Sequence, residues 1–188
     1  MRTLKNLFSQ LHIYVLWLLL SVFFWGWIFT LITDTKPEYK VTIFAETYAL
    51  EDTALAAALS ESLPEGIRMV KVHPFSYAMF EESTIKSADL FIVRASKAPG
   101  YIDSFAPLTL DGEGESLQMD DRAYGVRIYD AASGYGAAEA YITYLAPGEE
   151  PEDFYLFFGA DSLHTGEKDD GAILLAKQLL HLGEGGTR

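Results

Sequence analysis

An uncharged stretch of twenty residues, Ile13–Ile32, constrains this chain more than any other feature. It reads IYVLWLLLSVFFWGWIFTLI, and only Ser21 and Thr30 interrupt its apolar and aromatic side chains. At about 1.5 Å per residue, a helix of this length spans roughly 30 Å, the thickness of the hydrocarbon core of a bilayer. The segment also contains rings of the kind enriched at membrane interfaces: Tyr14, Trp17, Trp25 and Trp27. The sequence therefore predicts a transmembrane helix.

The flanks of this segment indicate an anchor and its orientation. The apolar run is longer than the roughly 7–15 residues of the hydrophobic region of a signal peptide. The residues that follow, Thr33–Pro37, lack the small-residue pattern at which signal peptides are cleaved. We therefore expect an uncleaved anchor in the plasma membrane, in contact with lipid. Arg2 and Lys5 lie on the N-terminal side, and basic flanks stay cytoplasmic, so the C-terminal part should be extracytoplasmic.

The rest of the chain is strongly acidic. Residues 34–188 contain 12 of the 14 basic residues and all 27 acidic residues, a net charge of −15. This charge argues against a nucleic-acid partner, because phosphate binding needs a basic surface. The chain has no cysteine, which excludes disulfides, cysteine-ligated zinc and a thiol nucleophile. We predict a cytoplasmic N-terminus at 1–12, a membrane helix at 13–32, a linker at 33–39, one domain at 40–182 and a disordered tail at 183–188.

The first half of the domain follows a strand–helix pattern. Short apolar runs rich in β-forming residues predict strands at 41–45, 67–72 and 89–95. Between them, alanine and leucine at helical spacing predict a helix at 50–63, and a weaker pattern predicts another at 77–87. Strands that alternate with helices in this way are typical of parallel sheets with right-handed crossovers.

The second half is less regular. We predict an exposed loop at 111–121, strands at 125–129, 140–145 and 154–158, turns at 131–136 and 147–151, and a last helix after Asp169 and Asp170. The short spacing between the last two strands suggests an antiparallel hairpin. The predicted fold class is therefore a three-layer α/β domain with a mixed, mostly parallel sheet.

Three segments carry a family resemblance. They read VTIFAE at 41–46, SADLFIV at 87–93 and YLFFGADS at 155–162. Together with the order of elements over 40–182, they resemble extracytoplasmic solute-binding proteins of bacterial ABC importers. The resemblance implies a non-enzymatic protein that captures a small-molecule solute, such as a sugar, and works beside an ABC-type permease. That family has two lobes and this chain has the length of one, so a second subunit would supply the other wall of a cleft.

Candidate ligand-binding residues follow the first and third predicted strands. Glu46, Thr47 and Tyr48 come after one, and Ser96 and Lys97 come after the other. Ligands of open α/β sheets bind beyond the carboxyl ends of the strands, and these side chains suit a polyhydroxyl or peptide-like ligand. The alternative is that the two hydroxyl residues cap the helices that follow them.

Tyr135 is a further candidate, because it stands in a glycine-containing turn. With Tyr124 and Tyr129 it would form a stacking surface for a ligand. The alternative is an ordinary strand face that is half buried.

Metal and catalytic sites are not expected. His164 stands near Asp161, Asp169 and Asp170, but the spacing of a known zinc site is missing, and a loop histidine with ordinary hydrogen bonds is the simpler interpretation. The chain also lacks the nucleophile elbow, phosphate-binding loop and metalloprotease motifs of common enzymes. We predict a protein with no catalytic residue, metal or cofactor. The alternative function is a structural or assembly subunit of a membrane complex that binds only protein.

Overall fold

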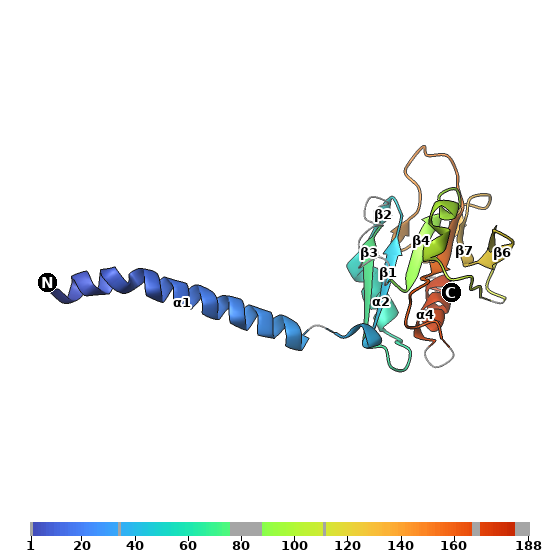
Figure 1. Ribbon diagram of the computed structural model, residues 1–188. Coiled ribbons are helices and arrows are strands. Elements are labelled where there is room, and N and C mark those ends of the chain that lie inside the picture. The colour runs from blue at the N-terminus through green and yellow to red at the C-terminus, as the bar shows by residue number, and fades with distance from the viewer. Residues whose placement is uncertain (1, 34, 76–87, 111, 167–169, 183–188) are drawn as a thin grey trace. The chain divides into compact units, whose positions relative to one another are not determined.

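The computed structural model describes residues 2–33, 35–75, 88–110, 112–166 and 170–182. The chain forms two compact units, Met1–Lys36 and Pro37–Arg188. The first is a helix and the second is an α/β domain (Figure 1). The predicted helix at 77–87 and the predicted tail at 183–188 lie outside the described residues.

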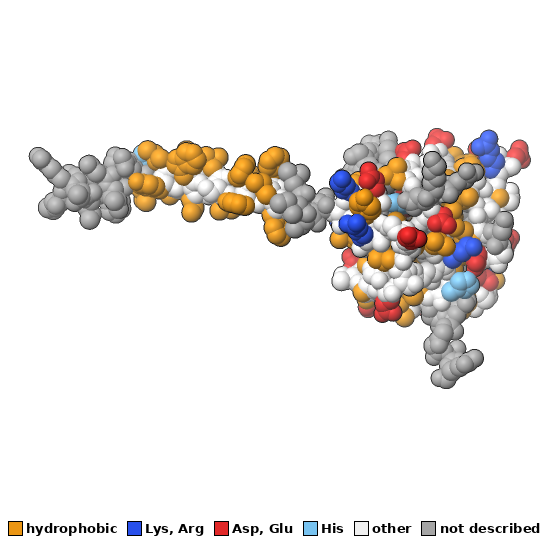
Figure 2. Space-filling model, turned by 90° about the horizontal axis from the view of Figure 1, so that it is seen from below, with side chains coloured by type: hydrophobic (Ala, Val, Ile, Leu, Met, Phe, Trp, Pro, Cys, Tyr) orange, Lys and Arg blue, Asp and Glu red, His pale blue; other side chains and the backbone are white. Residues whose placement is uncertain are grey.

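The N-terminal unit is a single helix, α1, which runs from Arg2 to Thr33. Its apolar segment Leu11–Phe29 has the length and composition to cross a membrane, and a signal sequence has the same properties. Large side chains along this segment are exposed, as Phe23 shows with an exposed fraction of 82%. Figure 2 shows hydrophobic side chains along the described part of the helix, whereas the visible face of the domain mixes acidic, basic and uncharged groups.

The domain is built on a mixed six-stranded sheet. Its order is β3 (Met69–Pro74), β1 (Lys40–Ala45), β4 (Leu90–Arg94), β10 (Phe154–Phe158), β7 (Val126–Asp130) and β8 (Tyr135–Gly136). The strands β3, β1 and β4 are parallel, as the strand–helix pattern predicted. The expectation of a mostly parallel sheet is wrong, because β10 runs antiparallel to both of its neighbours and β8 runs antiparallel to β7.

Within the described residues, two helices cover one face of the sheet. These are α2 (Asp52–Ser60) and α4 (Gly171–Leu180), and the Gln178 amide of α4 donates a hydrogen bond to the Leu59 carbonyl of α2 at 3.2 Å. Alternate residues of the strands point to these helices, since side chains of a strand alternate between faces. The resulting core is mainly aliphatic and includes Val41, Ile43, Val70, Val72, Leu90, Ile92, Leu55, Leu59, Leu175 and Leu179.

The opposite face carries an aromatic core. Phe91 and Phe157 of the sheet are fully buried there, and Phe157 stacks on Phe105 with ring centroids 4.4 Å apart. The described segments that pack on this face include a 3-10 segment, Ala98–Ser104, with Phe105 directly after it, and the hairpin of β5 (Leu117–Met119) and β6 (Arg122–Tyr124). A helix in this third layer stays a prediction, because 77–87 lies outside the described residues.

The predicted hairpin of the last two strands is wrong. The segment at 140–145 contains only a short strand, β9 (Ile142–Thr143), which pairs with β2 (Ala49–Leu50) instead of with β10. Both edges of β10 are already occupied by β4 and β7. As a result, residues 49–50 extend as a strand and the helix predicted from residue 50 begins at Asp52.

Candidate functional site

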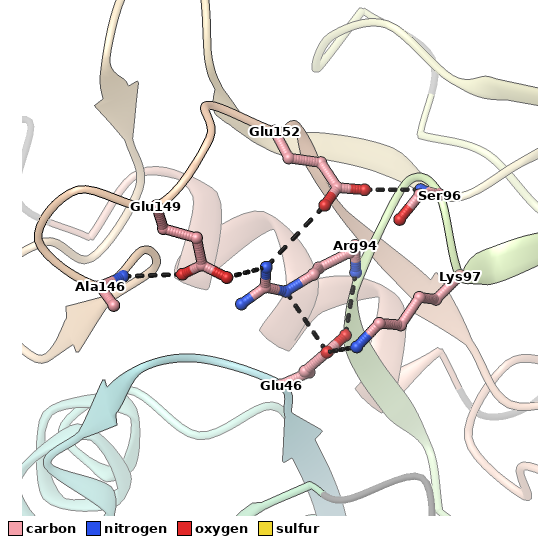
Figure 3. Close-up of polar contacts among 7 residues, drawn as sticks. All are labelled: Glu46, Arg94, Ser96, Lys97, Ala146, Glu149 and Glu152. Carbon is pink, nitrogen blue, oxygen red and sulfur yellow. Dashed lines mark hydrogen bonds and ion pairs between the residues drawn. The ribbon is translucent and has the colours of Figure 1, made fainter.

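The strands that precede the predicted ligand-binding residues are neighbours in the sheet, because β1 and β4 pair in parallel. Ala45 pairs with Ile92, so the two strands end at the same edge of the sheet. Glu46, directly after β1, meets Arg94, the last residue of β4, and Lys97 in the loop that follows β4 (Figure 3). Five charged residues from three chain segments meet here, and we call them the Arg94 cluster: Glu46, Arg94, Lys97, Glu149 and Glu152.

Arg94 is the centre of this cluster. Its Nη1 atom forms a short ion pair with Glu149 and lies 3.9 Å from the Glu152 carboxylate. The Nε–H group is buried and makes no hydrogen bond of good geometry to the residues that the structure describes, so its 3.3 Å contact with Glu46 Oε1 is an ion pair alone. The hydrogen bond to Glu149, with the negative charges around it, raises the pKa of Arg94 although burial opposes the shift. The guanidinium therefore stays charged at any pH at which the fold exists.

Both carboxylate oxygens of Glu46 are engaged. Oε1 accepts a hydrogen bond from Lys97 Nζ at 2.8 Å, and Oε2 accepts one from the Arg94 backbone N–H at 3.3 Å. Only 9% of Glu46 is exposed. A buried carboxylate requires partners of this kind, because desolvation of an unpaired charge is costly. Glu46 therefore has a structural role at the end of β1.

The other two carboxylates of the cluster also bind the backbone. Glu152 accepts a hydrogen bond from the Ser96 N–H at 2.8 Å, and Glu149 accepts one from the Ala146 N–H at 2.9 Å. The bond from Arg94 is the main reason that the pKa of Glu149 lies below its ordinary value of 4.5. These contacts tie the loops after β1 and β4 to the segment that leads into β10.

The two predicted hydroxyl residues do not cap helices. Thr47 precedes α2, but the residue next to the helix is Glu51 and no side chain caps it. Ser96 lies before the 3-10 segment, whose flanking residue is Lys97, again with no side-chain cap. The capping alternative is therefore wrong for both. The Thr47 hydroxyl is buried and has no hydrogen-bond partner among the described residues, whereas Tyr48 is 59% exposed.

Tyr135 lies away from the Arg94 cluster, on the edge strand β8. It lines a cavity of about 150 Å³ with Arg127 and Asp130. The three tyrosines do not form one stacking surface, because Tyr124 is buried in the aromatic core and Tyr129 stacks on Tyr144 at 4.8 Å on the opposite face. The prediction of a three-tyrosine platform is therefore wrong.

The interpretation of His164 as an ordinary loop residue is confirmed. It is 1% exposed, and its Nε2 atom lies 3.1 Å from the Pro37 carbonyl. Its backbone N–H donates to the Ser162 hydroxyl, which in turn donates to Asp89. Within the part of the chain that the structure describes, no group of three or more acidic or histidine side chains can hold a metal ion.

Sequence reasoning missed three members of the Arg94 cluster. Arg94 lies inside the strand predicted at 89–95 and is the last residue of the observed strand β4, where a charge marks the sheet edge. Glu149 lies in the turn predicted at 147–151, and Glu152 follows that turn. No local pattern shows that these carboxylates fold back 55 and 58 residues along the chain to meet Arg94.

Comparisons with known proteins do not add to this geometry. No family model, curated protein or solved structure matches the chain. Its function must therefore be argued from the helix, the domain and the clusters described above.

Proposed function

We propose that this protein is a single-pass membrane protein with a cytoplasmic N-terminus and an extracytoplasmic α/β domain. In this proposal the domain acts as a non-enzymatic binding or accessory component of a transporter complex. The main support for this proposal is the difference in burial of apolar side chains between the two units. The apolar segment Leu11–Phe29 exposes its large side chains, whereas the domain has its own buried cores. Exposed apolar area of this extent is stable in lipid.

The proposed partner is an ABC-type permease or another integral membrane protein, with a small-molecule solute as the cargo. The segment order and the parallel β3–β1–β4 unit support this resemblance to one lobe of a solute-binding protein. One lobe offers half of a cleft. The rest of the binding surface would come from the partner.

A second candidate is an assembly subunit that contacts only protein. The Arg94 cluster favours it, because both oxygens of Glu46 are already bonded to Arg94 and Lys97. A ligand at this edge would have to displace these contacts. Under this candidate the exposed aromatic helix and the acidic surface serve as docking surfaces, and the domain stabilises a complex without binding a solute.

The first experiment tests the anchor. Replacing Leu19 and Phe23 with lysine should release the protein from membranes, because each lysine at the centre of a span costs about 2.5–3.5 kcal/mol. Membrane flotation and protease added to intact cells measure the result. The matched control replaces Leu163 and Leu174, exposed residues of the domain, with lysine. A wild-type chain that fractionates as a soluble protein, or a domain that resists external protease, would overturn the proposal.

A second experiment separates the two candidates. The full-length protein is purified in detergent, and its melting temperature is measured with sugars, peptides and amino acids, since a ligand that binds the native state raises it. A solute-binding component is stabilised by at least one compound. An assembly subunit is stabilised by none of them and instead co-purifies with membrane proteins only when its helix is intact.

A further inference from the structure

We propose that an open cavity beside the β5–β6 hairpin binds a small solute that carries both an ammonium group and a carboxylate group. The cavity has a volume of about 410 Å³, and its lining includes Asp103, Asp120, Arg122 and Tyr124. It lies on the aromatic face of the sheet, apart from the Arg94 cluster. The inference rests on the proposed function, because it names the class of solute that the domain would bind.

The charged groups of this cavity are unpaired within the described part of the chain. Arg122, Asp103 and Asp120 form no hydrogen bond or ion pair through their side chains. Two other arginines of the domain are neutralised: Arg94 contacts three carboxylates, and Arg127 lies within 3.7 Å of Glu115, Asp130 and Asp153. A ligand in the cavity therefore displaces only water from the guanidinium and the two carboxylates.

The polar groups stand on a packed frame. Arg122 and Tyr124 are two residues apart on β6, so their side chains lie on the same face of the strand. Tyr124 is 6% exposed and packs in the aromatic core, and Phe105 of the cavity wall stacks on Phe157. Side chains that are held by packing before a ligand arrives lose less entropy when it binds.

The hairpin turn places the carboxylate of Asp120 in an unusual backbone conformation. Asp120 and Asp121 have φ angles of 47° and 60°, the left-handed region that a two-residue hairpin of this type requires. Asp is one of the few residues besides glycine and asparagine that adopt this conformation readily. The turn therefore fixes the backbone of Asp120, whose side chain lines the cavity.

The charge balance selects the class of ligand. One guanidinium and two carboxylates line the cavity, so a simple anion meets two repulsive groups and a simple cation leaves the guanidinium unused. A zwitterion satisfies both, with its carboxylate on Arg122 and its ammonium group between the aspartates. The lining carries one more negative charge than positive, so a dibasic amino acid should bind more tightly than an acidic one. The volume lies within the range of about 300–1,000 Å³ that is usual for small-molecule sites.

The test is isothermal titration calorimetry on the full-length protein in detergent. The probes are L-lysine, L-alanine and L-glutamate, with acetate, methylamine and D-glucose as monofunctional or uncharged comparisons. We expect L-lysine to bind most tightly, L-glutamate most weakly, and acetate and methylamine not to bind measurably. Replacing Arg122 with glutamine should raise the Kd for L-lysine at least about tenfold, because it removes a charge-assisted contact.

Two further variants make the result specific. Arg68→Gln is the matched control, since this guanidinium lies over the Tyr39 ring, 4.5 Å from its centroid, and does not line the cavity. It should leave the Kd unchanged. Asp103→Asn should remove the preference for L-lysine over L-alanine while L-alanine still binds, a change of specificity that simple unfolding would not produce.

Clear outcomes overturn the inference. If none of the three amino acids binds, or if Arg122→Gln and Asp103→Asn both bind L-lysine as the wild type does, the cavity is not the site. Binding of D-glucose without any amino acid would show that the ligand class is wrong. In each case the proposed function survives if the anchored chain is still stabilised by at least one compound of the panel described above. The proposed function fails if the chain does not integrate into membranes, whatever it binds.

Discussion

Two arginines of this domain stand in opposite electrostatic situations. Arg94 is 16% exposed in its side chain and surrounded by three carboxylates, whereas Arg122 is exposed and has no charged partner among the described residues. Both lie at the end of a strand and border a loop. The carboxylates around Arg94 also accept hydrogen bonds from backbone N–H groups, which hold them in place beside the guanidinium. An arginine saturated in this way stabilises the fold, and an unpaired one is available to a ligand.

The largest effect is expected when Arg94 is replaced by methionine. This change leaves Glu46, Glu149 and Glu152 close together without the shared cation, and breaking a fully buried charge pair costs about 3–5 kcal/mol. Because the site is partly exposed, we expect the free energy of unfolding to fall by about 2 kcal/mol. Arg122→Met should change it by less than about 0.5 kcal/mol.

Urea unfolding of the full-length protein, followed by circular dichroism, measures both variants. All three tryptophans lie in the N-terminal helix, so tryptophan fluorescence would not report on the domain. Equal losses for Arg94→Met and Arg122→Met would contradict the distinction between a structural and an available arginine.

A smaller effect, and one that depends on pH, is expected at Glu149. Its pKa is lowered in the folded state, chiefly by the hydrogen bond from Arg94. The stability that this carboxylate contributes is therefore present above its ordinary pKa of 4.5 and is lost as the pH falls through the lowered value. Glu149→Gln should lower the melting temperature at pH 7, and the difference from the wild type should shrink below about pH 4. A difference that is constant with pH would rule out the charge as its cause.

The smallest effect is expected at Lys97. Its ammonium group bonds to Glu46, but 46% of the side chain is exposed, so water screens the pair. Lys97→Met should change the free energy of unfolding by less than about 0.5 kcal/mol, and 0.5 M salt should remove the change. A loss as large as that of Arg94→Met would mean that Lys97 shares the structural role of Arg94.

Much of the fold could be predicted from local patterns. The strand at 41–45, the strand at 89–95 and the last helix were found from runs of apolar residues at the spacing of the element concerned. These segments are buried on one or both faces, so the spacing of their apolar side chains shows which kind of element they form. The short strands β5, β6 and β8 were missed, because two or three residues carry too little pattern.

Part of the candidate site could likewise be predicted from the sequence and part could not. Glu46 and Lys97 were placed at one sheet edge because parallel neighbouring strands end together, and the structure brings them to 2.8 Å. The role of Glu149 could not be predicted, because its turn looks like any exposed acidic loop. Its partner depends on β10 entering the sheet beside β4, a long-range pairing that leaves no local signal.

The sequence by itself determined the apolar N-terminal helix, the acidic character of the rest and the parallel strand–helix unit. Each of these features follows from the spacing or the charge of residues that are close together in the sequence. Only the tertiary structure decided that β10 separates β4 from β7, that Arg94 is neutralised, and that Arg122 faces a cavity with unpaired carboxylates. Charges act through space, and the distances between them are set by which strands pair, so the partner of a charged side chain is known only when the chain has folded.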